Sequence, residues 1–141
     1  GGGWIAVRGS FFTPDDLPAW LLIAAVMFWI AGFDLIYACQ DYEHDVAEGL
    51  HAWPARFGIA RALRLAKLNH IVFMTFLVLA GLAAGLSWPY YVAAALTAGL
   101  LVYEHRLVSP DDLSRLNVAF FNMNSYIAIT LLAGTLLAVA I

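Results

Sequence analysis

Apolar and polar residues follow one another in long blocks along this chain, and four of the blocks are apolar. A helix needs about 20 predominantly apolar residues to cross the hydrocarbon core of a bilayer. The four apolar blocks cover approximately residues 17–39, 65–86, 88–103 and 117–141. The first and third blocks begin with Pro18 and Pro89, a residue that the first turn of a helix accepts. The pattern predicts an all-α integral membrane bundle with four transmembrane helices, the third being the shortest.

The connections between these blocks predict how the bundle is oriented. Residues 40–64 and 104–116 are predicted to be polar loops, whereas a tight hairpin at Ser87 and Trp88 connects the second block to the third. The basic residues in and beside the two loops are Arg56, Arg61, Arg64, Lys67, Arg106 and Arg115. Because cytoplasmic loops carry an excess of Lys and Arg, we expect both loops to face the cytoplasm and both chain ends to face the opposite side.

The composition agrees with a lipid environment and excludes several classes of protein. The 141 residues are 63% hydrophobic and 12% charged, whereas soluble domains contain about 25% charged residues. This excludes a soluble enzyme, and the hydrophobic content excludes a disordered chain. A net charge of −3 without a basic block argues against nucleic acid as a partner. The single cysteine, Cys39, excludes a disulfide framework and a cysteine-based zinc site.

Acidic residues gather where the first apolar block ends. If the first helix continues past the membrane edge, five residues fall within an arc of about 80°, namely Asp34, Tyr37, Asp41, Asp45 and Glu48. Asp41 and Asp45 would then lie one above the other, about 6 Å apart along the axis. Mg²⁺ takes oxygen ligands, commonly one or two carboxylates with waters and substrate phosphates. This spacing therefore supplies half of a magnesium site.

Other interpretations of these carboxylates remain open. A polar helix end can simply carry a solvated cluster of charges, although like charges four residues apart destabilise a helix unless they are compensated. Asp34 lies within the apolar block, and a carboxylate at membrane depth indicates a functional site by default. The alternative for Asp34 is a buried side chain that bonds to a neighbouring helix.

Three further polar residues are candidates for substrate contact. Arg56, within the sequence PARFG, is the expected anion contact, whereas the other basic residues of that loop serve topology. Asn122 and Asn124 begin the fourth block, where an amide either bonds to a neighbouring helix or contacts substrate. The histidines at positions 51, 70 and 105 show no metal-ligand spacing in the sequence.

Two stretches of the chain resemble a known family. The run FDLIYACQDYEHDVAEGLHAWPARFG, followed by three further apolar blocks, and the later SPDDLSRLNVAFFNMN are similar to the second half of the UbiA superfamily of membrane prenyltransferases. Within that superfamily they resemble the bacterial 4-hydroxybenzoate polyprenyltransferase-like group. The resemblance implies an all-helical bundle of about nine spans, with two aspartate-rich motifs facing a central cavity. The four blocks of this chain would be its last four spans.

The resemblance also implies roles for individual residues. Asp41 and Asp45 match the second aspartate-rich motif, which binds Mg²⁺ and the isoprenyl diphosphate. Asp34 and Tyr37 match the cavity wall just before that motif, and Arg56 matches a basic position near the diphosphate. The family's first motif, NDxxDxxxD, does not occur in this sequence. We therefore expect a C-terminal part of a longer protein that needs the N-terminal helices of the same protein for activity.

The implied reaction is the Mg²⁺-dependent transfer of a polyprenyl group from polyprenyl diphosphate to 4-hydroxybenzoate, in ubiquinone or menaquinone biosynthesis. The implied location is the inner membrane of a bacterium. One alternative is prenylation of a dihydroxynaphthoate for menaquinone. Another is a non-enzymatic membrane module for transport or ion binding, whose acidic stripe would line a pathway. A third is an inactive remnant or a partial gene product.

Overall fold

A computed structural model describes residues 1–9 and 11–141, and within them it contains helices and turns but no strand. The long helices are α2 (Leu17–Tyr37), α5 (Ile59–Ala83), α6 (Trp88–Leu107) and α7 (Met123–Ala140). The short elements are α1 (Gly2–Arg8), η1 (Pro14–Asp16), α3 (Tyr42–Ala47), α4 (Trp53–Phe57) and η2 (Val118–Asn122), a single turn of π-helix. The predicted all-α class is confirmed.

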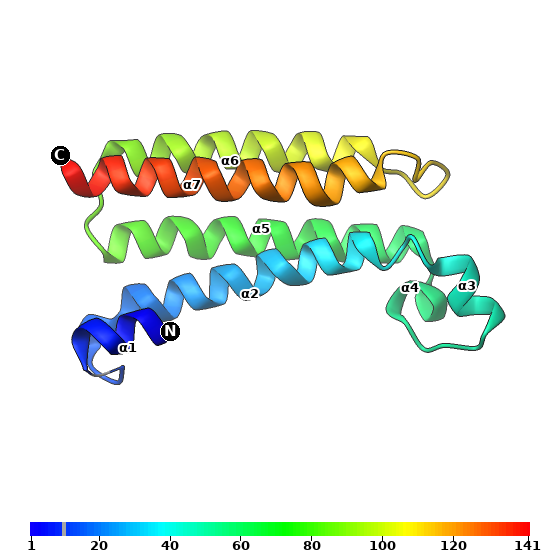
Figure 1. Cartoon of the computed structure of the whole chain (residues 1–141), viewed down its shortest axis with the longest axis horizontal. Helices are drawn as coiled ribbons and strands as arrows, with labels where there is room; N and C mark the ends of the chain where they lie inside the picture. Colours follow the sequence, from blue (N-terminus) through cyan, green and yellow to red (C-terminus); the bar gives the residue numbers. More distant parts are fainter. Residues whose placement is uncertain (10) are drawn as a thin grey trace.

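The four long helices run side by side as a bundle (Figure 1). α2 packs along α5, α6 packs along α7, and α5 also contacts α6. The short helices α3 and α4 lie together at the end of the bundle where α2 ends and α5 begins, whereas α1 lies near the other end. The bundle therefore has one polar end, built from α3, α4 and the segment between α6 and η2.

Small residues bring α6 close to its neighbours. Gly134 of α7 lies directly against Ala93 of α6, and a side chain at position 134 would also meet the Pro89 carbonyl. Gly81 of α5 leaves room for the ring of Tyr90, whose hydroxyl donates a hydrogen bond to the Leu77 carbonyl at 2.8 Å. Interfaces of this kind are typical of membrane helices, where small side chains allow backbones to approach one another.

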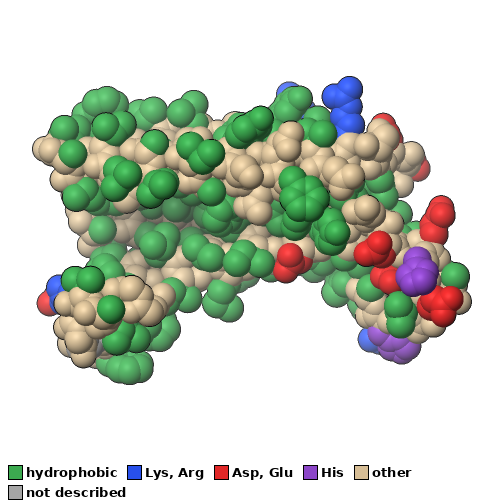
Figure 2. Space-filling view, viewed as in Figure 1, with side chains coloured by type: hydrophobic (Ala, Val, Ile, Leu, Met, Phe, Trp, Pro, Cys, Tyr) green, Lys and Arg blue, Asp and Glu red, His purple; other side chains and the backbone are tan. Residues whose placement is uncertain are grey.

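Hydrophobic side chains occupy both the interior and the outside of the bundle. The main core cluster contains Phe33, Phe73, Leu77, Leu101 and Ile127, each at most 4% exposed. Many large apolar side chains point outward instead, and hydrophobic groups cover the outer surface of the long helices (Figure 2). Acidic and histidine side chains gather at the end that carries α3 and α4. An apolar exterior with polar ends is the surface that a bilayer requires.

The number of spans differs from the prediction. Three segments are long and apolar enough to cross a membrane: Pro14–Tyr37, Ile59–Ala83 and Val118–Ala140. The fourth predicted span falls in α6, which is a continuous helix of 20 residues packed along the bundle but does not meet that standard. Its mean hydropathy is lowered at both ends, by Glu104, His105 and Arg106 in the last turns and by the Trp-Pro-Tyr-Tyr sequence of the first turn. The prediction of four spans was therefore one too many, and the chain is a multi-pass membrane protein.

Both predicted loops are shorter than expected. The segment 40–64 contains α3, α4 and the first turn of α5, and α6 continues to Leu107, beyond the predicted end at 103. Pro54 starts α4, and Gly58, at φ 87°, separates α4 from α5. These short helices could not be predicted from the sequence, because their formation depends on packing rather than on a long apolar pattern.

Candidate functional site

The first helix does not continue through the acidic segment as one piece. α2 ends at Tyr37, and the chain turns through residues 38–41 before α3 begins at Tyr42. In this turn the Cys39 amide donates to the Ile36 carbonyl at 3.1 Å, and the Gln40 amide donates to the Tyr37 carbonyl at 2.9 Å. These bonds are tighter than the α-helical pattern and redirect the chain. The predicted single stripe from Asp34 to Glu48 is therefore wrong, because the two halves lie on separate helices.

At the start of α3, where Asp41 is the N-cap residue, the spacing of the two motif aspartates is as predicted. The Asp45 amide donates to the Asp41 carbonyl at 2.8 Å, so the residues are one helical turn apart. Asp41 is exposed, whereas Asp45 is only 9% exposed. Burial of a carboxylate is costly unless a partner compensates it. One aspartate of the pair is thus held against the protein while the other faces outward.

Asp34 lies on α2, and its side chain is exposed. In the sequence it follows the buried Phe33 and precedes the buried Ile36 by two residues. Within this chain the structure does not support the alternative interpretation of Asp34 as a buried residue bonded to a neighbouring helix. The alternating burial places Asp34 on the face of α2 that this bundle leaves uncovered. A carboxylate there is available to a ligand or to another polypeptide segment.

Tyr37, at the end of α2, packs against the segment that precedes the last helix. Its ring lies 4.5 Å from the ring of Phe120 and 6.3 Å from that of Phe121, measured between centroids. Both phenylalanines belong to the π-helical turn η2, which ends at Asn122. Turns of π-helix are rare and occur frequently at functional sites. The structure therefore brings Tyr37 together with the segment that carries Asn122, which is exposed. Asn124, the second residue of α7, is half-buried.

Arg56 lies on α4, beside α3 at the polar end of the bundle (Figure 1). Its side chain is exposed, and its guanidinium lies 5.2 Å from the centre of the Phe57 ring. A guanidinium stacked on an aromatic face keeps its hydrogen-bond donors free for an anion. The structure thus places Arg56 on the element next to Asp41 and Asp45.

A turn between α6 and η2 borders the same polar end. Ser109 and Asp112 form an isolated bridge with each other, and the Asp112 carboxylate accepts a hydrogen bond from the Ser114 amide at 2.9 Å. The hydrogen bonds from Ser114 lower the pKa of Asp112 below its usual range. These local contacts show that the SPDDLS sequence forms a turn, in which the Asp112 carboxylate binds the backbone amide of Ser114.

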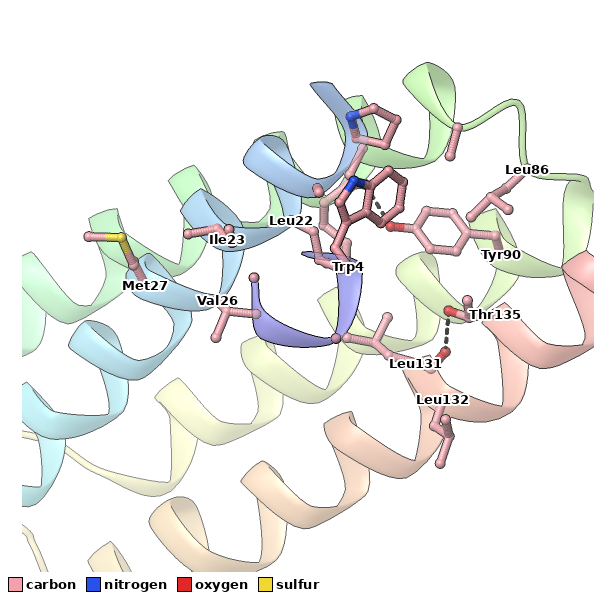
Figure 3. Close-up of a pocket in the computed structure, with 17 residues that line it drawn as sticks. Trp4, Leu22, Ile23, Val26, Met27, Leu86, Tyr90, Leu131, Leu132 and Thr135 are labelled. Atoms are coloured by element: carbon pink, nitrogen blue, oxygen red, sulfur yellow. Dashed lines mark hydrogen bonds between the residues drawn. The ribbon is translucent and has the colours of Figure 1, made fainter. Parts of the chain in front are cut away.

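An apolar cavity of about 740 Å³ lies at the opposite end of the bundle (Figure 3). Figure 3 shows Trp4 and Leu22 facing it from one side and Tyr90 and Leu131 from the other. It lies between the beginnings of α2 and α6 and the ends of α5 and α7. This cavity is therefore remote from Asp41, and none of the described residues that line it has the charged side chain that a diphosphate requires.

The structure also brings together three residues that the sequence analysis did not associate. His70 of α5 meets Glu104 and His105 of α6 inside the bundle. No spacing in the sequence reveals this group, because it forms only when two helices pack. The signals available in the sequence were His70 within the second apolar block, and Glu104 and His105 directly after the third.

Comparisons with known proteins agree with these observations. A sequence profile described as the UbiA prenyltransferase family matches residues 2–126. A 4-hydroxybenzoate octaprenyltransferase of Cupriavidus necator is 33% identical over 129 residues, which is 90% of this chain and 45% of that protein. A protein of the same description from Nitrosospira multiformis is 32% identical over 120 residues, covering 85% of this chain and 41% of the relative.

A more distant relative, a 4-hydroxybenzoate octaprenyltransferase of Salmonella paratyphi B, is 28% identical over 134 residues. These residues make up 94% of this chain and 46% of the relative. The chain thus spans less than half the length of the curated relatives that it matches. No solved structure matches it.

Proposed function

This chain belongs to the UbiA prenyltransferase family, and from that premise we propose that it takes part in transferring a polyprenyl group from polyprenyl diphosphate to 4-hydroxybenzoate. The observation that carries the proposal is the pair Asp41 and Asp45, one turn apart on a short helix at the polar end of an apolar bundle. The names of the three relatives, each a 4-hydroxybenzoate octaprenyltransferase, support the choice of acceptor.

We propose that Asp41 and Asp45 bind Mg²⁺. The donor set fits this ion, because both side chains offer carboxylate oxygens and the exposed Asp41 leaves space for waters and phosphate oxygens. When bound, Mg²⁺ neutralises the charge of the diphosphate as this group leaves. Arg56 on the adjacent α4 would hold the diphosphate through charge-assisted hydrogen bonds.

The remaining site residues would act on the organic part of the reaction. The C–O bond between the allylic carbon and the diphosphate breaks, a ring carbon of 4-hydroxybenzoate ortho to the hydroxyl bonds to that allylic carbon, and the ring carbon loses its proton. Tyr37, stacked on Phe120, would form an aromatic wall that excludes water from the electron-poor allylic group. Asp34 would face the same region from α2, and Asn122 and Asn124 would contact the substrates from the start of the last helix.

We propose that the reaction takes place at the cytoplasmic face of a bacterial inner membrane. The excess of Lys and Arg beside the polar end of the bundle supports this orientation. An apolar outer surface allows the long prenyl chain to approach from the bilayer. We also propose that turnover requires further helices of the same protein, because the two aspartates supply only part of the coordination shell of Mg²⁺.

A prenyl-transfer assay tests the proposal. Membranes that contain the complete protein are incubated with a polyprenyl diphosphate and either 4-hydroxybenzoate or a dihydroxynaphthoate, with Mg²⁺ or with EDTA. We expect prenylated 4-hydroxybenzoate as the product with Mg²⁺ and no product with EDTA. Asp41→Asn and Asp45→Asn should each lower the rate at least about 100-fold, which is the effect of removing one group that stabilises charge in the transition state.

The exposed Glu43 of the same helix provides the matched control, since Glu43→Gln removes a carboxylate outside the DxxxD pair. This variant is expected to keep the wild-type rate. Product from the dihydroxynaphthoate alone would reject the proposed acceptor. Unchanged turnover in both aspartate variants would reject the metal site.

A further inference from the structure

Three side chains with metal-ligand chemistry converge between α5 and α6, away from the aspartate motif. Nδ1 of His70 lies 3.0 Å from Nε2 of His105 and 3.8 Å from Oε1 of Glu104. One nitrogen or oxygen atom from each residue lies within 4.8 Å of the other two. Two imidazoles and one carboxylate thus surround a common point.

The burial of this group makes the convergence chemically significant. Glu104 is 0% exposed and His70 is 2% exposed. Both carboxylate oxygens of Glu104 lack a hydrogen-bond partner among the described residues. A buried polar atom without a partner destabilises a protein by roughly 1–3 kcal/mol, and a charged atom by more. Both oxygens are therefore available as ligands for a cation.

We propose that His70, Glu104 and His105 bind a divalent transition-metal ion of the Zn²⁺ class. Zn²⁺ binds imidazole nitrogen and carboxylate oxygen at about 2.0–2.2 Å in tetrahedral geometry, which sets the ligand atoms about 3.3 Å apart. The two distances from His70 Nδ1, 3.0 Å and 3.8 Å, lie on either side of that separation. Imidazole ligands favour Zn²⁺ and similar ions over Mg²⁺ and Ca²⁺.

The surroundings of His70 fix the orientation of its ring. The imidazole packs against Gly32 of α2, where any side chain would collide with the ring, and its centroid lies 5.0 Å from that of Phe33. Nε2 of His70 is the atom that faces Gly32, so Nδ1 points toward α6. This packing holds the ring in the orientation that ligation through Nδ1 requires.

The site has room for a fourth ligand. A cavity of about 760 Å³ lies beside it, with His70 and His105 in its wall and the charged residues Lys67 and Arg106 among its other lining residues. A water or another small ligand can therefore complete the tetrahedron from the cavity. The positive charge of these two residues favours an anionic fourth ligand.

The proposed ion would cross-link the middle of α5 to the last turns of α6. α5 and α6 are joined by a short connection over residues 84–87, and the site lies far along both helices from that connection, with His70 on α5 and Glu104 and His105 on α6. A bound ion adds its binding free energy to the folded state. The site is separate from the oxygen ligands on α3, so this inference does not depend on the proposed prenyl transfer.

Metal binding to the complete protein tests the inference. The protein is purified in detergent, exposed to Zn²⁺ in the presence of excess Mg²⁺, and passed through a gel-filtration column before its zinc content is measured. We expect about one Zn²⁺ per chain to be retained, and the thermal unfolding temperature to rise with added Zn²⁺. Co²⁺ in place of Zn²⁺ should give the visible absorption of a four-coordinate site.

Variants identify the ligands and provide a control. Glu104→Gln and His105→Gln preserve side-chain size, and each should weaken Zn²⁺ binding at least about tenfold, since even residues that only support a ligand have effects of that size. His51→Gln removes an exposed histidine outside the group and should bind Zn²⁺ like the wild type.

Two outcomes would overturn the inference. One is a wild-type protein that retains no Zn²⁺ and shows no change in unfolding temperature, which would leave a direct hydrogen bond between the two histidines. The other is retained Zn²⁺ that both variants keep. If the Glu104 variant does not fold, the same measurements on His105→Gln decide, because His105 is only half-buried.

Discussion

The side chains between the end of α2 and the middle of α3 differ sharply in exposure, although they are close in the sequence. Cys39 is 1% exposed and Asp45 is 9% exposed, whereas Asp34 and Asp41 are open to the surroundings. The spacing of Asp41 and Asp45 could be predicted from the sequence because both residues lie within one local helical turn. The contact of Tyr37 with Phe120 could not be predicted, because it joins residues that only the packing of two distant helices brings together.

Cys39 gives a prediction for a single side chain. It lies just after α2, where its thiol donates to the Leu35 carbonyl at 3.2 Å, and burial raises its pKa from the ordinary 9.0 to about 11. Only the thiolate reacts with alkylating reagents. At pH 8 the thiolate fraction, and with it the alkylation rate, should be about 100-fold lower than for a free thiol, since each pKa unit is a factor of ten.

Alkylation with a maleimide, followed by mass spectrometry, measures this rate. The comparison is Ser114→Cys in a Cys39→Ala background, because Ser114 is exposed. The same pKa shift predicts that the thiol's contribution to stability is constant below pH 9 and decreases between pH 9 and about 11, as the unfolded state loses its proton first. Equal rates for the two cysteines at pH 8 would contradict the burial of Cys39.

Among the secondary-structure elements, the long helices follow from the sequence and the short ones do not. The apolar blocks predicted the ends of α2, α5 and α7 to within a few residues, but α5 begins six residues earlier than predicted, and the π-helical turn η2 precedes α7, which begins six residues later. The break after Tyr37 was not predicted, because the pattern of acidic residues fits a continuous helix equally well. The last turns of α6 were predicted to be a loop because they contain charged residues. The structure instead buries Glu104 of these turns against His70 of α5, a contact that the sequence does not reveal.

The packing of α6 on α7 gives a prediction for a pair of elements. A methyl group at Gly134 would collide with Ala93, and neither Ala93 nor the Pro89 carbonyl can turn away. We expect Gly134→Ala to lower the free energy of unfolding by about 1–3 kcal/mol through overpacking. Denaturation of the purified protein in detergent, followed by circular dichroism, measures the change.

Gly99 provides the matched control because it also lies within a long helix, but an added methyl group would meet no atom within 4 Å. Gly99→Ala should leave stability unchanged or raise it by about 0.5–1 kcal/mol through the loss of glycine's backbone freedom. Equal destabilisation by both substitutions would show that helix flexibility, rather than the close approach of α6 and α7, explains the effect.

At the scale of the whole molecule, the two ends of the bundle have different chemistry. The aspartate motif, Arg56 and the turn at Asp112 lie at one end, and the apolar cavity beside Trp4 lies at the other. The membrane location and the helical class could be predicted from composition alone, because lipid leaves few alternatives to helices. The convergence of His70 and Glu104 could not, since it depends on the rotation of two helices about their axes.

This asymmetry predicts which end of the bundle the cytoplasm reaches. The positive-inside rule places the α3–α4 end and the segment between α6 and η2 in the cytoplasm, and the connection between α5 and α6 on the other side. Two exposed positions report on these ends: Ser114 on the first and Ala84 on the second. In spheroplasts that express the complete protein, a membrane-impermeant maleimide should label Ala84→Cys and leave Ser114→Cys unlabelled until the membrane is permeabilised. The buried native Cys39 gives little background. The reverse pattern would place Asp41 and Asp45 outside the cell, away from the cytoplasmic supply of prenyl diphosphate that the proposed reaction requires.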